Sequence, residues 1–181
     1  RNLGLRDGLL DAMLARIDDI FERRGEKLSM VGWSLGGVYA RELAKLRADK
    51  IRMVITLGSP HSGDITATNA RRFYEFVAGH PVTNPPIETQ LNQAPPVPST
   101  SIYTKSDGVV AWQNCHQQMP AQQAENIQVA GSHCGLGVNP SVLYVIADRL
   151  AQAPDNWAPF AIEGLRKSFF CTPEFDAAQA Y

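Results

Sequence analysis

One stretch constrains this chain more than any other: V-G-W-S-L-G-G, residues 31–37, in which three glycines surround a single serine. An apolar, strand-like run over residues 27–33 leads into Ser34, and a helix-like run follows it directly. A strand that turns at once into a helix strains the turn residue and exposes its side chain. Gly32 and Gly36 would let the flanking backbone pass closely. The pattern therefore predicts a nucleophilic Ser34, since its spacing fits neither a P-loop nor a dinucleotide-binding turn.

The segments around this stretch alternate between helix-like and strand-like patterns. Apolar residues at helical spacing predict three helices, over residues 7–24, 35–47 and 139–150. Short apolar or β-branched runs predict four strands, over residues 27–33, 51–57, 101–105 and 126–131. Such alternation is typical of an α/β fold in which helices cover both faces of a parallel sheet.

A proline-rich stretch interrupts this alternation. Six of the twelve prolines fall between residues 81 and 98. Proline lacks a backbone donor and restricts the residue before it, so we expect an irregular cap over residues 61–99, with one short helix near 66–78. The sequence then predicts one domain over residues 1–151 that carries the cap, and a C-terminal extension over 152–181.

Composition excludes several classes of function. The net charge of −1 gives no indication of a nucleic-acid partner. No apolar run approaches the ~20 residues that cross a bilayer, so we expect no transmembrane segment. Three cysteines are too few for a disulfide scaffold, which slightly favours the cytoplasm but leaves the compartment open. The neighbouring pairs Cys115–His116 and His133–Cys134 lack the usual zinc spacing of about two to four intervening residues, and we expect no metal or cofactor.

A serine hydroxyl is a weak nucleophile that needs a base, and the base needs an acid to fix its tautomer. His133, in G-S-H-C-G, follows the last predicted strand, and Asp107 follows the strand before it. The carboxyl ends of parallel strands share one edge of the sheet, where Ser34 also lies. We therefore predict His133 as base and Asp107 as acid, with Asp64 as the alternative acid. The amide of Leu35, at the start of a helix, is suited to bind an oxyanion.

Four motifs, in this order, resemble the α/β-hydrolase fold. G-W-S-L-G-G is similar to the serine turn of lipases. T-L-G-S-P-H-S-G is similar to the strand and loop that follow it in bacterial lipases and in lipases of the GPI inositol-deacylase branch. T-K-S-D-G-V-V resembles their acid loop and G-S-H-C-G-L their histidine loop. The resemblance covers residues 1 to about 151 and implies a serine esterase or lipase that is acylated on Ser34 and then hydrolysed by water, with small-molecule ester or lipid substrates that carry apolar acyl groups.

The same resemblance raises an expectation about the start of the fold. In α/β hydrolases, strands precede the first helix, and a loop among them gives a second oxyanion amide. Nothing before residue 7 matches these parts, so the resemblance implies an N-terminally truncated fold. The strand at residues 28–31 is apolar on both faces and would have an open edge. We expect an upstream segment or a second copy of the chain to pair with it.

Four aromatic residues are candidates for the walls of an acyl pocket: Trp33, Phe73, Tyr74 and Trp112. The alternative for those in the cap is plain packing onto the body of the domain. Cys115 and Cys134 are candidates for a disulfide between the acid and histidine loops, which would indicate an exported protein. The alternative is two reduced thiols, and Cys171 is left over in either case.

Two further functions are compatible with these residues. An acyltransferase with the same three side chains would pass the acyl group to an alcohol or amine. A catalytically silent fragment or binding module would result if no oxyanion loop is supplied. Ester hydrolysis is the function that we expect.

Overall fold

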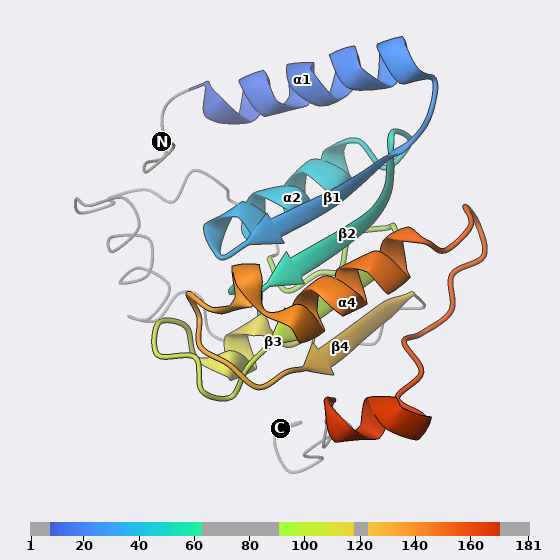
Figure 1. Ribbon diagram of the computed structural model, residues 1–181. Coiled ribbons are helices and arrows are strands. Elements are labelled where there is room, and N and C mark those ends of the chain that lie inside the picture. The colour runs from blue at the N-terminus through green and yellow to red at the C-terminus, as the bar shows by residue number, and fades with distance from the viewer. Residues whose placement is uncertain (1–7, 63–90, 118–122, 171–181) are drawn as a thin grey trace.

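The computed structural model describes residues 8–62, 91–117 and 123–170 (Figure 1). The helix predicted near residues 66–78 lies outside these ranges, as do Asp64 and Cys171. The described elements, in chain order, are α1 (Leu9–Arg24), β1 (Leu28–Trp33), α2 (Leu35–Leu46), β2 (Ile51–Leu57), β3 (Ser99–Tyr103), η1 (Trp112–Cys115), β4 (Ala124–Gln128), η2 (Leu136–Val138), α4 (Pro140–Leu150) and η3 (Gly164–Ser168).

The four strands form one sheet in the order β1-β2-β3-β4, and every neighbouring pair is parallel. Figure 1 shows the arrowheads of the strands pointing toward the same end of the molecule. The predicted class, an α/β fold with a parallel sheet, is confirmed. The seven helices and strands that the sequence predicts within the described residues are present, with ends within three residues of those expected.

Two apolar clusters lie on opposite faces of the sheet. On one face, α1 and α2 pack over residues such as Ile51 and Val54 of β2. On the other face, α4 packs over Met53, Ile55 and Leu57 of the same strand. A strand that is covered on both faces has an almost continuous apolar sequence, which is what the run I-R-M-V-I-T-L provides.

The chain beyond α4 also contributes to the core. Phe160 and Phe170 are buried and contact each other edge to face, with ring centroids 4.9 Å apart. Both belong to the cluster beneath α4. The Phe160 amide donates to a carboxylate oxygen of Glu125 at 2.6 Å, which fixes this segment to β4. The described part of the extension therefore packs on the sheet, although no regular period in its sequence predicts this.

The strand that leads into Ser34 lies at an edge of the described sheet. β1 is first in the strand order and pairs with β2 along its whole length. Among the described residues, no strand pairs with its other side. Val31 and Trp33 are 45% and 46% exposed on this strand. Pairing with an upstream segment or a second copy stays a prediction. None of the described helices is long and apolar enough to cross a membrane.

Candidate active site

Ser34 occupies the single residue between the end of β1 and the start of α2. Its backbone has φ 56° and ψ −126°, a positive φ that is uncommon for a residue with a side chain. Such a conformation costs on the order of 1–3 kcal/mol and persists only where the surroundings enforce it. Here the Ser34 amide donates to the Leu57 carbonyl of β2 at 2.8 Å, which holds the turn against the sheet.

Close backbone packing explains two of the three glycines in the motif. A Cβ on Gly32 would collide with the backbone of Gly36 and Gly37, and one on Gly37 would collide with the Ser59 side chain. A Cβ on Gly36 would meet nothing within 4 Å. The backbone of both Gly36 and Gly37 thus lies against Gly32, but the expectation that Gly36 must lack a side chain is wrong, because a Cβ there would point into open space.

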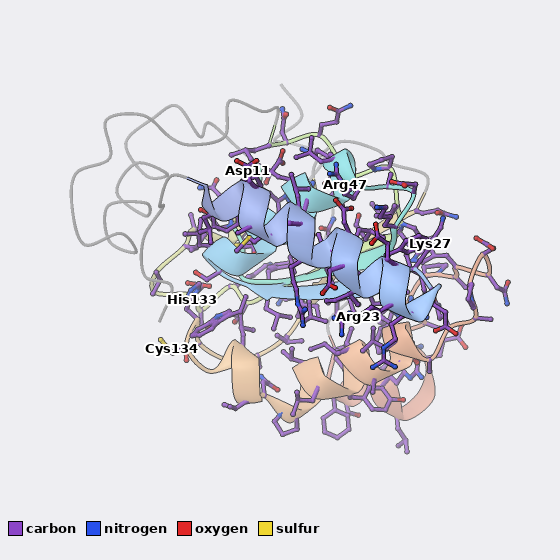
Figure 2. All side chains as sticks on the ribbon, turned by 90° about the horizontal axis from the view of Figure 1, so that it is seen from above. Asp11, Arg23, Lys27, Arg47, His133 and Cys134 are labelled. Atoms are coloured by element: carbon purple, nitrogen blue, oxygen red, sulfur yellow. The ribbon has the colours of Figure 1, made fainter. Side chains whose placement is uncertain are left out.

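A chain of hydrogen bonds joins Ser34, His133 and Asp107. His133 Nε2 lies 3.0 Å from the Ser34 hydroxyl oxygen, and Nδ1 lies 2.7 Å from Asp107 Oδ2. Their exposed side-chain fractions are only 6% for His133 and 1% for Asp107. In Figure 2, His133 lies at the opposite end of the molecule from Lys27, which immediately precedes β1. The fold thus brings together, at the carboxyl ends of the strands, three side chains that are far apart in the sequence.

The orientation of the Asp107 carboxylate is fixed on both of its oxygens. Oδ1 accepts from the amides of Val109 and Val110 at 2.9 and 2.8 Å, while Oδ2 faces the imidazole. A carboxylate that accepts a hydrogen bond from the Nδ1–H group selects the imidazole tautomer with its proton on Nδ1. Nε2 is then free to accept a hydrogen bond from the serine hydroxyl. The alternative acid, Asp64, lies outside the described residues.

Gly58 is a site residue that sequence reasoning missed. It follows β2 with φ 54°, and its amide donates to the Ile102 carbonyl. A Cβ there would lie 3.1 Å from both Asp107 Oδ2 and His133 Nδ1. The signal in the sequence was a glycine directly after a buried strand that ends beside the serine strand. The hydrogen-bonded side chains of Asp107 and His133 therefore pack directly against the backbone of Gly58, where a side chain would not fit.

The two tryptophans predicted as pocket walls have different surroundings. The indole N–H of Trp33 donates to the His133 carbonyl at 3.1 Å. The ring centroids of Trp33 and His133 lie 5.8 Å apart. Trp33, the last residue of β1, therefore helps to hold the histidine loop in position. Trp112 stacks on Tyr103, with ring centroids 5.6 Å apart, and packs against the same small cluster as Leu35, the residue after Ser34. Phe73 and Tyr74, the other predicted wall residues, lie outside the described part of the chain.

Leu35 is the first residue of α2. The N–H groups in the first turn of a helix have no acceptor within the helix and are partially positive. The Leu35 amide belongs to this set and directly follows Ser34 in the chain, and its role as an oxyanion donor stays a prediction.

The structure does not contain the candidate disulfide. Cys115 and Cys134 are both free thiols, the first buried and the second exposed. Cys115 packs in a small cluster with Tyr103 and Val110, and burial raises the pKa of its thiol above the usual range. Cys134 faces solvent beside His133, as Figure 2 shows, so the two sulfurs have different environments. The described residues contain no group of three or more ligands suited to a metal.

Comparisons with known proteins agree with this architecture. A model of the PGAP1-like alpha/beta domain family matches residues 4–131. Similar solved structures include the monoacylglycerol lipase of Paleococcus ferrophilus, with a TM-score of 0.52 and 14% identity over 78% of this chain and 73% of that one. An alpha-beta serine hydrolase homologue from Coxiella burnetii has a TM-score of 0.57 and 15% identity over 83% and 66% of the two chains.

A third similar structure is MGS-MChE2, an alpha/beta hydrolase from a lagoon-sediment metagenome. It has a TM-score of 0.56 and 15% identity over 82% of this chain and 74% of that chain. At these identities, the likeness establishes the fold alone. Among curated proteins, none matches this chain by sequence.

Proposed function

This chain belongs to the PGAP1-like alpha/beta domain family and has the α/β-hydrolase fold that its motifs predict, and we propose that it is a serine hydrolase of carboxylic esters. The observation that carries this proposal is the continuous hydrogen-bond chain from Asp107 through His133 to Ser34. This chain supports the proposed roles of Ser34 as nucleophile, His133 as general base and Asp107 as the acid that orients it.

In the proposed reaction, Ser34 Oγ attacks the ester carbonyl while His133 Nε2 accepts the hydroxyl proton. The carbonyl oxygen becomes an oxyanion, which the Leu35 amide stabilises. The tetrahedral intermediate then expels the alkoxide, which takes the proton from His133 and leaves as the alcohol. The acyl group remains on Ser34 as an ester.

Water completes the cycle. His133 deprotonates a water molecule, which attacks the acyl-enzyme carbonyl, and the serine leaves with the same proton. The product acid is released and the free enzyme is restored. Throughout, the buried Asp107 carboxylate holds the imidazole in place and stabilises its protonated form.

Apolar acyl groups are the proposed substrates at this site. Trp33, which is 46% exposed, presents an aromatic surface beside the nucleophile. We propose that Trp33 forms part of the acyl pocket, with Trp112 and the cap residues Phe73 and Tyr74 as further candidates. The lipase among the similar structures is in keeping with this substrate class.

Hydrolysis of p-nitrophenyl esters of increasing acyl length tests the proposal. We expect saturable turnover that favours longer acyl chains, and a fall of at least about 10³-fold in kcat for Ser34→Ala. Adding an alcohol tests for acyl transfer, since a transferase would convert the ester into the new ester instead of the acid. Equal rates for the wild type and Ser34→Ala would refute the assignment.

A further inference from the structure

A second set of titratable groups is buried apart from the three proposed catalytic residues. Arg41 lies on α2 and His61 follows β2, and each is only 1% exposed. At a helical rise of about 1.5 Å per residue, Arg41 lies roughly 9 Å along α2 from its start at Leu35. The proposed mechanism uses neither residue, although burying a guanidinium is costly unless its charge and donors are satisfied.

The hydrogen bonds of Arg41 are incomplete within the described part of the chain. Nη2 donates to the Gln117 amide oxygen at 2.7 Å and to the Gln93 carbonyl at 3.1 Å. Nε and Nη1 are buried and have no acceptor. Both acceptors of Nη2 are neutral. The neighbouring carboxylate, Glu42, accepts a hydrogen bond from Lys45 at 2.6 Å, and its charge also favours the charged form of Arg41, although less strongly than burial opposes it.

His61 is also incompletely bonded. Its Nε2 lies 3.1 Å from the Ser101 hydroxyl, while Nδ1 is buried and makes no full hydrogen bond among the described residues, although the Cys115 carbonyl lies close enough to act on the ring. The Thr56 hydroxyl donates to Ser101, which leaves the Ser101 proton free to donate to His61 Nε2. Nδ1 then carries the imidazole proton and is a third unused donor.

The same segment of chain holds the two residues in place. The Asn114 carbonyl accepts from the His61 amide at 2.8 Å, and Gln117, three residues later, binds Arg41. Burial, together with the charge of Arg41, keeps the pKa of His61 well below its usual range, so His61 is neutral. The two side chains therefore act on each other electrostatically, with the guanidinium as the charged member.

We propose that Arg41 and His61 form a buried binding site for an oxyanion, a phosphate or carboxylate group. An anion is an acceptor at every oxygen, so it matches two guanidinium donors and one imidazole donor. It also neutralises the buried positive charge, which a water molecule cannot do. Unpaired buried donors of this kind are rare in proteins and commonly mark an ion or a water that completes them.

Inorganic phosphate is the probe that tests this site. The background is Ser34→Ala, so that the outcome does not depend on catalysis. With ionic strength and pH held constant by exchange against chloride, phosphate should raise Tm in a saturable manner. The rise should be roughly 5–10 °C at about 100 times the dissociation constant. Arg41→Met, which keeps an unbranched apolar stem but has no donor, should lose this rise.

Arg23→Met is the matched control. Arg23 is an exposed arginine on α1 that pairs with Asp19, and the phosphate response should persist in this variant. An equal response of the Ser34→Ala protein with and without Arg41→Met overturns the proposal, and so does no response in both. If Arg41→Met is too unstable to measure, His61→Phe, which removes the third donor, should weaken phosphate binding, and an unchanged response overturns the proposal.

A second experiment identifies the source of the anion, and it rests on the proposed esterase activity. We compare KM for p-nitrophenyl succinate, which carries a free carboxylate, with KM for neutral p-nitrophenyl butyrate. If Arg41→Met raises KM for the succinate ester alone, the anion belongs to the substrate. If Arg41→Met changes KM for neither ester, although the protein that keeps Arg41 binds phosphate, a free anion is the ligand. If neither ester is hydrolysed, the proposed function fails while the phosphate result still stands.

Discussion

At the scale of single residues, the candidate site combines three hydrogen-bonded side chains with a glycine, Gly58, whose lack of a side chain leaves room for two of them. Ser34, His133 and Asp107 could be proposed from sequence because each follows a strand of a parallel sheet. Gly58 was missed although a glycine directly after a buried strand is a signal, because its contacts with the acid and histidine loops appear only in the fold, and the same is true of the indole hydrogen bond of Trp33. The assignment of Gly36 failed for the same reason: a motif does not show which glycine faces which backbone.

Gly58→Ala tests the space beneath the pair of Asp107 and His133. The new Cβ would lie 3.1 Å from both the carboxylate and the imidazole nitrogen, at a backbone φ that disfavours a side chain. We expect kcat/KM for ester hydrolysis to fall on the order of 10²-fold, as for other displacements of about 1 Å at reacting groups. Gly108→Ala is the control, because a Cβ there meets nothing within 4 Å. Equal activity of the two variants would contradict this role for Gly58.

At the scale of elements, strong periodic patterns predicted the helices and strands. The structure of polar or aperiodic segments was harder to predict. The start of α4 carries the residue types that favour a helix N-terminus, Asn139 as the cap and Pro140 at the first position, and the Asn139 side chain accepts from the Ser141 amide at 2.9 Å. β4 begins before its apolar residues, at Ala124, which pairs with Ser99 of β3, and the next residue, Glu125, forms an ion pair with Arg149 at 3.0 Å. The aromatic residues after α4 have no regular spacing, so their packing depends on tertiary contacts that sequence reasoning does not reveal.

Asp18 joins α1 to the connection between α2 and β2. Its carboxylate accepts from Arg47 at 2.9 Å and from Lys50 at 2.7 Å. These two hydrogen bonds lower the pKa of Asp18 from 3.8 to about 2. A lowered pKa contributes stability that is fully present above the unfolded-state value and is lost as the pH falls through the folded-state value.

We therefore expect Asp18→Asn to lower Tm at neutral pH. The difference between wild type and variant should begin to shrink below about pH 4 and should be lost as the pH falls through about 2. Thermal unfolding of both proteins across this range measures it. Asp11→Asn, a substitution near the start of the same helix, is the control. A difference in Tm for Asp18→Asn that is independent of pH would show that the ion pairs do not stabilise α1.

At the scale of the whole molecule, the open edge of β1 is the feature with the largest consequence. The amides of Leu28 and Ser34 donate toward β2, so by alternation those of Ser29, Val31 and Trp33 point to the other side. An exposed edge that also carries apolar side chains is a template for another strand.

We predict that this edge is paired in the working protein, by an upstream segment or by a second copy. Amide hydrogen exchange should then be slow at Ser29, Val31 and Trp33, and a mass measurement in solution would distinguish the two partners. A stable monomer whose outward amides exchange rapidly would contradict the prediction. Amides of β2 and β3, which lie inside the described sheet, are the internal reference for protection.

The central claim is that Ser34 is an activated nucleophile, and covalent labelling with a fluorophosphonate probe tests it most directly. The probe reacts with activated serines whatever the natural substrate, so it requires no assumption about acyl chain or alcohol. We predict one adduct, mapped by peptide mass spectrometry to Ser34, that disappears in Ser34→Ala and is strongly slowed in His133→Ala. Labelling that persists in Ser34→Ala, or a folded wild-type protein that does not react, would contradict the account.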